Sequence, residues 1–177
     1  RKGSTLIEVI NPTSIWPHTK SLAERRAHAI AITEHKVGND KKQQAEAAFN
    51  KLKWTFRGGP NCPESSTPNA GVGAMVRFPK KLVQGEPANK VMKEAEGIGR
   101  VMVCWLEIGG HKKVIMGVVY GKQGGAGSKK TRAVTEACLQ AVKKELRTLP
   151  KHPTVIVGDF NAPIDKLEEV DDLIQNH

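Results

Sequence analysis

Apolar residues, many of them β-branched, recur along the chain in short runs that polar segments separate. Such runs are typical of half-buried or fully buried strands when Gly, Pro, Asn or Asp bounds them. The pattern predicts strands at 5–10, 28–33, 53–57, 72–78, 99–108, 112–120 and 154–160. Because a Gly109-Gly110 turn separates 99–108 from 112–120, we expect these two strands to form a β-hairpin.

Helices are predicted where apolar residues recur at helical spacing within longer polar segments. These segments are 20–27, 40–53 and 129–149, and 165–176 is expected to form a final helix or turn. In 129–149 an apolar residue recurs every four positions from Val134 to Leu146, which indicates one buried stripe. Segments 58–71 and 79–90 are punctuated by Gly and Pro and are predicted to be loops.

Strands that alternate with helices predict an α/β fold, with the helices packed on the outside of β-sheets. The chain has 177 residues and shows no internal repeat, so residues 1–177 are interpreted as a single domain. No apolar run is long enough to span a membrane, and we expect no membrane partner.

Charge narrows the choice of partner. Lys and Arg number 28 against 18 Asp and Glu, a net charge of +10. An anionic partner is expected, and nucleic acid is the commonest one, although a solvated lysine-rich surface explains the charge equally well. From 122 to 153 the chain is basic, whereas from 159 to 177 it is acidic. The basic part could hold a polyanion while the acids hold a metal beside it.

The cysteines indicate the compartment. Cys62, Cys104 and Cys138 are far apart and form no CxxC pair, which argues against both a disulfide framework and a zinc site. Cys104 and Cys138 lie in apolar surroundings and are interpreted as core residues. A reducing intracellular compartment, the nucleus or the cytoplasm, is therefore expected.

Four predicted strands end on polar side chains. Asn11, Glu34 and Tyr120 close three of them, and the fourth ends on Asp159, with Asn161 two residues later. Ligand sites collect at strand ends in layered folds, and a carboxylate there is costly unless it meets a cation or hydrogen-bond donors. The residues therefore predict one shared site. Its oxygen donors suit Mg²⁺ or Mn²⁺ rather than zinc, and nearby basic residues favour phosphate-ester hydrolysis.

The segments that carry these residues resemble the endonuclease/exonuclease/phosphatase superfamily, whose fold is deoxyribonuclease-I-like. They are "VIVGDFNAP" (155–163), "AIAITEHK" (29–36), "VIMGVVYG" (114–121) and "GVGAMVRF" (71–78), and the GDFN box is the most specific. Within the superfamily, abasic-site and retroelement-type endonucleases look most similar. The resemblance implies a two-sheet sandwich flanked by helices and a Mg²⁺-dependent phosphodiester hydrolase that acts on nucleic acid, with DNA as the expected partner.

The resemblance also implies a role for each residue of the shared site. Glu34 would be a direct metal ligand with Asn11 beside it, and Tyr120 would lie against the scissile phosphate. Asp159 would position or deprotonate the attacking water. Asn161 would hold a phosphate oxygen and orient a catalytic histidine.

The chain departs from the family in one respect. The family continues beyond the GDFN box and closes with a Ser-Asp-His motif, which nothing between Asn161 and His177 matches. We therefore expect a C-terminally incomplete domain whose activity on its own is open. Two alternatives remain: a catalytically incomplete module that binds nucleic acid or protein, and a phosphatase of the same superfamily.

Basic residues follow the third of these strands. Lys122, Lys129, Lys130 and Arg132 are candidate nucleic-acid contacts, although a solvated helix start is the simpler interpretation for most of them. Because positive charge at a helix N-terminus is unfavourable for the helix dipole, its presence there favours a phosphate partner. The intervening Gly-rich loop lacks the G-x-x-x-x-G-K-[ST] spacing of a P-loop. His35 could reach phosphate or metal, or be a solvated loop residue.

Overall fold

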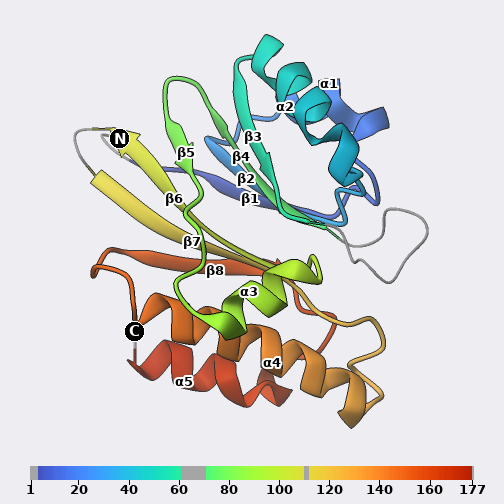
Figure 1. The fold of residues 1–177 in the computed structure, drawn as a ribbon, viewed down its shortest axis with the longest axis vertical. Helices are drawn as coiled ribbons and strands as arrows, with labels where there is room; N and C mark the ends of the chain where they lie inside the picture. The colour runs from blue at the N-terminus through green and yellow to red at the C-terminus, as the bar shows by residue number, and fades with distance from the viewer. Residues whose placement is uncertain (1–3, 61–70, 110–111, 177) are drawn as a thin grey trace.

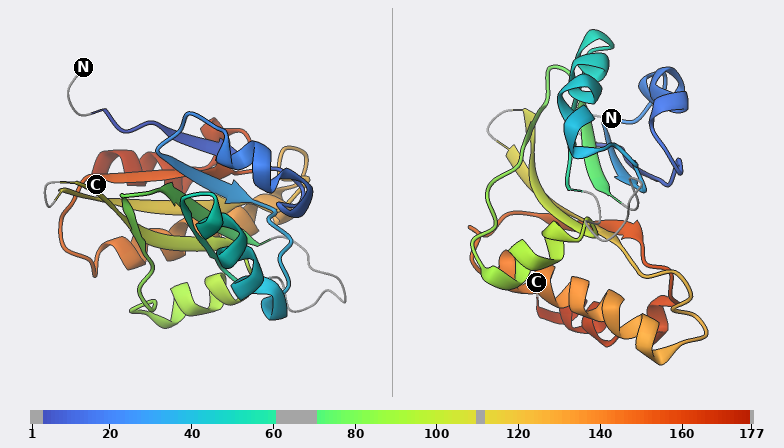
Figure 2. Two further views of the ribbon diagram at one scale, coloured as in Figure 1. Left: turned by 90° about the horizontal axis from the view of Figure 1, so that it is seen from above. Right: turned by 45° about the vertical axis from the view of Figure 1, so that its right-hand side comes forward.

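The computed structural model describes residues 4–60, 71–109 and 112–176. In these residues two four-stranded sheets pack face to face, and helices cover the outer face of each sheet (Figure 1). The views in Figure 2 show the same layers from two further directions. The predicted α/β sandwich is thus confirmed, because each sheet has one face toward the other sheet and one toward helices.

The first sheet is built from the N-terminal half of the chain, in the order β1-β2-β4-β3. Its strands are β1 (Ile7–Ile10), β2 (Ala29–Thr33), β3 (Trp54–Gly58) and β4 (Val72–Arg77). The helices α1 (Thr19–Ala23) and α2 (Lys42–Lys51) lie on its outer face (Figure 1). There Ile30 and Ile32 of β2 and Phe56 of β3 pack with Phe49 of α2 in a buried apolar cluster.

The second sheet has the order β5-β6-β7-β8. Its strands are β5 (Lys81–Val83), β6 (Val101–Gly109), β7 (Lys112–Tyr120) and β8 (Thr154–Asp159). Three helices cover its outer face: α3 (Lys90–Gly97), α4 (Lys129–Leu146) and α5 (Glu168–Asn176) (Figure 1). Cys138 and Val142 of α4 are buried against Val119 of β7, as the four-residue spacing predicts.

The inner core lies between the two sheets. Ala29, Ala31 and Ala74 face it from the first sheet, and larger residues such as Met102 and Met116 face it from the second. Large residues on one face therefore meet small ones on the other, which is how facing layers fill the space between them. Tyr120 belongs to this same cluster, so its ring is anchored in the core.

Strand direction brings the polar strand ends together. β1 pairs with β2 in parallel, and β7 pairs with β8 in parallel, whereas the other pairs are antiparallel. Across the sandwich β2 contacts β7 and β8, and β1 contacts β8. The C-terminal ends of these four strands therefore meet at one end of the molecule.

Each of the seven predicted strands is present, with ends that differ by at most two residues from the prediction. The prediction of a loop at 79–90 is wrong in part, because β5 lies within it and pairs with β6. Helix α3 was not predicted at all. It begins after Asn89, whose side-chain oxygen accepts a hydrogen bond from the Met92 amide at 2.9 Å. The long helix ends at Leu146, three residues before the predicted end.

Cys104 and Cys138 are buried and free, as predicted for core residues, and Cys62 lies outside the described residues. Burial raises the pKa of the Cys104 thiol to about 12 and that of Cys138 to about 11, so both thiols are protonated at neutral pH. No helix in the described part of the chain is long and apolar enough to cross a membrane.

Candidate active site

The four polar strand ends form one cluster at the end of the sandwich. Asn11 follows β1, Glu34 follows β2, and Tyr120 and Asp159 close β7 and β8. The Asn11 side-chain amide donates a hydrogen bond to Asp159 Oδ2 at 3.3 Å, which links the first sheet to the second. Glu34 and Tyr120 are joined by a second side-chain hydrogen bond across the sheets. The structure thus brings together residues 148 positions apart.

Glu34 is held in an unusual backbone conformation. Its φ is +57°, in the left-handed region that glutamate rarely occupies, and its side chain is only 8% exposed. Such conformations cost about 1–3 kcal/mol and persist where the surrounding structure enforces them. The His35 amide next to it donates to the Gly71 carbonyl oxygen at 3.0 Å, which fixes the turn after β2. In this conformation the buried Glu34 carboxylate contacts the Tyr120 hydroxyl.

Tyr120 remains a protonated phenol over the whole physiological range. Burial raises the pKa of its hydroxyl well above the ordinary value, and the hydrogen bond to Glu34 and the Glu34 charge raise it further. The Arg100 guanidinium opposes this shift. It lies 5.3 Å from the Tyr120 ring centroid and donates to the carbonyl oxygens of Tyr120 at 3.2 Å and Gly121 at 3.0 Å. Gln123 donates to the phenol oxygen at 3.2 Å.

The GDFN box forms a tight turn after β8. Asp159 Oδ1 accepts a hydrogen bond from the Asn161 amide at 3.1 Å, and Asn161 has a φ of +52°. The Asn161 side chain donates to the Gly121 carbonyl oxygen at 3.1 Å. Gly158 is required because a Cβ there would clash with the main chain of β7 at Val119. The turn is thus pressed directly against the end of β7.

Thr135 of α4 ties this turn to the loop after β7. Its hydroxyl is fully buried, accepts from the Lys122 amide at 3.1 Å and donates to the Phe160 carbonyl oxygen at 3.3 Å. Phe160 itself turns back and packs on the apolar cluster beneath α4, as its place between two polar residues suggests. The positions of Asp159 and Asn161 therefore depend on a helix that lies outside the cluster.

His35 is not a site residue, and it is not solvated either. Its side chain is fully buried, and its ring meets Phe56 edge-on with centroids 6.1 Å apart. Nδ1 accepts a hydrogen bond from the Val37 amide at 3.0 Å. Burial, and then the charge of Lys42, lower the pKa of His35 to about 4. The imidazole is therefore neutral at pH 7 and serves the turn after Glu34.

The predicted nucleic-acid contacts lie on the loop after β7 and the first turn of α4. Lys122, Lys129 and Lys130 are exposed and Arg132 is half-buried. None of them forms an ion pair with another residue in the described ranges. The loop packs against Asn161, since a Cβ at Gly125 would meet the Asn161 carbonyl oxygen at 2.7 Å. Contact between these four basic residues and nucleic acid stays a prediction.

The donor set of the cluster fits a hard divalent ion better than zinc. Glu34 and Asp159 supply carboxylate oxygens, and Asn11 supplies an amide. Among the described residues no group of three or more His, Cys, Asp and Glu could hold a metal ion. Mg²⁺ typically uses one or two carboxylates and completes its shell with water and phosphate, whereas zinc sites use several His or Cys.

Sequence reasoning missed Arg100, Gln123 and Thr135. Each of them contacts the site from a segment with no recognisable motif: the residue before β6, the loop after β7, and the middle of α4. Arg100 and Thr135 bind main-chain carbonyl groups, and such contacts leave no pattern in the sequence.

Several solved structures share this fold. An AP endonuclease from Archaeoglobus fulgidus is 19% identical, with a TM-score of 0.61, and the match covers 92% of this chain and 60% of that one. The 3′ phosphatase NExo from Neisseria is 21% identical, with a TM-score of 0.57, and the match covers 89% of this chain and 58% of that one. The human Nocturnin catalytic domain is 14% identical, with a TM-score of 0.56, and the match covers 91% of this chain and 63% of that one. No protein-family model and no curated protein sequence matches the chain.

These likenesses confirm the fold class. It is the deoxyribonuclease-I-like fold that the sequence segments predict. The chain spans 58% to 63% of the length of these three solved chains.

Proposed function

We propose that the chain carries the nucleophile-positioning half of a Mg²⁺-dependent phosphodiesterase that acts on nucleic acid, with DNA as the expected substrate. The observation that carries this proposal is the meeting of Asn11, Glu34, Tyr120 and Asp159 through hydrogen bonds between the two sheets. The similar structures support it, because they include an AP endonuclease and a phosphatase bound to a product DNA hairpin.

The ion is assigned to Glu34, with Asn11 and Asp159 beside it. Glu34 is 8% exposed, and a buried carboxylate of this kind is stable when a cation or several donors compensate its charge. Tyr120 supplies one donor. When bound, Mg²⁺ would stabilise negative charge that develops on the phosphoryl oxygens.

The surrounding residues orient the phosphate and the water. Tyr120 stays protonated, so its hydroxyl can donate a hydrogen bond to a phosphate oxygen, and Arg100 holds it in place. Asn161 uses one amide hydrogen on Gly121 and keeps the second for a phosphate oxygen. Preorganised donors of this kind lower the barrier because they need no rearrangement during the reaction.

Asp159 is assigned to the attacking water. Each of its oxygens accepts one hydrogen bond, from the Asn11 side chain and from the Asn161 amide. The carboxylate is thereby fixed, and its remaining lone pairs can accept a proton from water. No histidine among the described residues belongs to the cluster, so within this part of the chain Asp159 takes the role of proton acceptor.

A plasmid-nicking assay tests the proposal, with the protein encoded by the whole reading frame that contains these residues. We expect nicking that needs Mg²⁺, stops with EDTA, and falls by roughly 10²–10⁴-fold in Asp159→Ala. Asp165→Ala is the matched control, because Asp165 is an exposed acid in the short 3₁₀ turn (Ile164–Lys166) beyond the GDFN turn. Nicking that survives both EDTA and Asp159→Ala refutes the proposal.

A phosphatase of the same superfamily is the second candidate, and the similarity to the 3′ phosphatase NExo favours it. The same protein would then release inorganic phosphate from a 3′-phosphorylated oligonucleotide while it leaves supercoiled plasmid intact. Oligonucleotide binding that is indifferent to Mg²⁺, without either reaction, would instead identify a binding module.

A further inference from the structure

A second basic surface lies at the opposite end of the sandwich from the candidate active site. β7 begins at Lys112 and ends at Tyr120, so the two surfaces are separated by the whole length of this strand. At about 3.4 Å per residue that length is roughly 27 Å. The surface consists of Lys80, Lys81, Lys112 and Lys113, which line one hollow, together with Phe78, two residues before Lys80; we call it the distal lysine surface.

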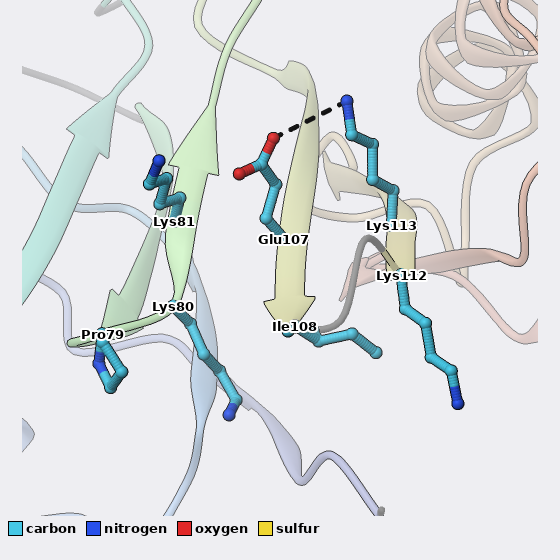
Figure 3. A pocket seen from close by; sticks show the side chains of 8 residues that line it. Pro79, Lys80, Lys81, Glu107, Ile108, Lys112 and Lys113 are labelled. Carbon is cyan, nitrogen blue, oxygen red and sulfur yellow. Dashed lines mark ion pairs between the residues drawn. The ribbon is translucent and has the colours of Figure 1, made fainter.

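Strand register places these lysines together. Lys81 of β5 lies opposite Glu107 of β6, which in turn lies opposite Lys113 of β7. Glu107 forms an ion pair with Lys113 at 3.6 Å (Figure 3). In the same view Lys80 and Lys112 extend beyond the strand ends. Together they line a hollow of about 300 Å³, in which four lysines meet one glutamate.

Most of this positive charge is uncompensated. Lys80, Lys81 and Lys112 form no ion pair with any residue of the described ranges. Like charges that converge on one hollow repel each other and attract a polyanion. A phosphate backbone meets this condition, because it presents regularly spaced negative charges that lysines neutralise.

An exposed aromatic residue, Phe78, precedes Lys80 by two positions in the chain. Phe78 is 69% exposed although it follows directly on β4, and its amide donates to the Lys53 carbonyl oxygen at 3.0 Å. Phe78 and Lys53 line a second hollow, of about 170 Å³. One ring among cations is too small an apolar area for a protein or membrane interface, but it suffices for a nucleobase to stack on.

We propose that the distal lysine surface binds single-stranded nucleic acid, with phosphates on Lys80, Lys81 and Lys112 and a base stacked on Phe78. A single strand is required because only an unpaired base can reach the ring. The site lies far from the strand-end cluster, so its binding does not depend on hydrolysis at that cluster.

Fluorescence anisotropy with a labelled 12-nucleotide oligothymidylate tests this proposal, in EDTA and over a series of salt concentrations. Replacing both Lys80 and Lys112 by Gln removes two phosphate contacts, so the slope of log K against log salt should flatten by about 1.4. Affinity at 0.1 M salt should then fall by about 25-fold. Phe78→Ala should weaken binding by about 5-fold or more without changing the slope.

The matched control replaces Lys20 and Lys144 by Gln, because both are exposed lysines on α1 and α4, away from this surface. It carries the same change in net charge and should bind within about 3-fold of the wild type. Equal weakening by the control pair overturns the proposal in favour of a general charge effect. A Lys80/Lys112 pair that loses binding to phosphatidylserine vesicles but keeps oligothymidylate binding overturns it in favour of a membrane.

Asp159→Ala separates this proposal from the proposed function. Oligothymidylate binding that survives in Asp159→Ala, and that falls when Lys80 and Lys112 are also replaced, supports the distal lysine surface whether or not the protein cuts DNA. If Phe78→Ala is silent and a blunt duplex competes as well as the single strand, the stacking contact is refuted.

Discussion

Thr135→Val removes the hydroxyl that joins α4 to the loop after β7 and to the turn after β8, and it preserves the shape of the side chain. Thr135 is fully buried, and its hydroxyl makes two hydrogen bonds, to the Lys122 amide and the Phe160 carbonyl oxygen. Each bond contributes about 1 kcal/mol net, and a partner left buried without a hydrogen bond costs somewhat more. The free energy of unfolding should therefore fall by about 2–3 kcal/mol.

For a domain of this size 1 kcal/mol corresponds to roughly 2–4 °C, so the Tm should fall by about 4–12 °C. Differential scanning calorimetry and urea unfolding give the two measurements. Thr135→Ser keeps the hydroxyl and should lose only about 1 kcal/mol, the contribution of one buried methyl group. Thr131→Val makes the same substitution one turn earlier on α4, at a half-buried position, and should change the free energy of unfolding by less than about 0.5 kcal/mol.

The order of these three variants decides the outcome. If Thr135→Val is as stable as the wild type, or if Thr135→Ser is as unstable as Thr135→Val, the hydroxyl does not hold the turn. The link between α4 and the Asp159–Asn161 turn would then need another cause.

Three further predictions concern the same end of the molecule. Tyr120 is the only tyrosine, so tyrosinate absorbance reports its hydroxyl alone. Glu34→Gln should lower the pKa of the Tyr120 hydroxyl, because the carboxylate charge that raises this pKa is lost. An unchanged titration would contradict the Glu34 contact. The pKa of His35 is lowered from 6.5 to about 4, so the unfolded chain takes up a proton first as the pH falls. The contribution of neutral His35 to the free energy of unfolding should be fully present above about pH 6.5, and this free energy should fall by up to about 3 kcal/mol toward pH 4. In His35→Gln, urea unfolding should show no such fall. Gly158→Ala should lower the free energy of unfolding by at least about 3 kcal/mol, because the new Cβ clashes with the β7 main chain. Gly97→Ala is the control: no atom lies near a Cβ there, so the change should be neutral or slightly stabilising. Equal urea midpoints for the two variants would contradict the close approach of β8 to β7 at Gly158.

The pattern of apolar and polar residues along the chain predicted the strands that form the inner core. The strands ending at Thr33, Tyr120 and Asp159 were each predicted from an apolar run that stops at a polar residue, and the structure has a strand in each place. Helix α3 was missed because it is only eight residues long, its segment is polar, and only Met92 is fully buried. Strand β5 is three residues long and is defined by its pairing with β6, which the segment itself does not encode.

The residues of the candidate site were predictable because each is attached to a strong local signal. Asp159 and Asn161 follow a buried strand through Gly158, and Glu34 follows another. His35 shows the limit of this reasoning, because its position beside Glu34 is equally compatible with a ligand, a solvated residue and a buried one. Only its packing against Phe56, Gly58 and Gly73 decides that the imidazole is buried and neutral.

The sequence by itself determined seven of the eight strands in the described residues, that four of them end on polar groups, and that the chain resembles one family of phosphoesterases. Those properties depend on neighbouring residues along the chain and on recognisable motifs. The tertiary structure alone decided that the parallel pairings bring those four ends together, that Arg100 and Thr135 hold them, and that lysines from β5 and β7 converge at the far end. These properties depend on contacts between residues far apart in the chain. The four strand ends meet only when the two sheets pack, whereas the lysines converge when β5 and β7 pair with β6 in one sheet.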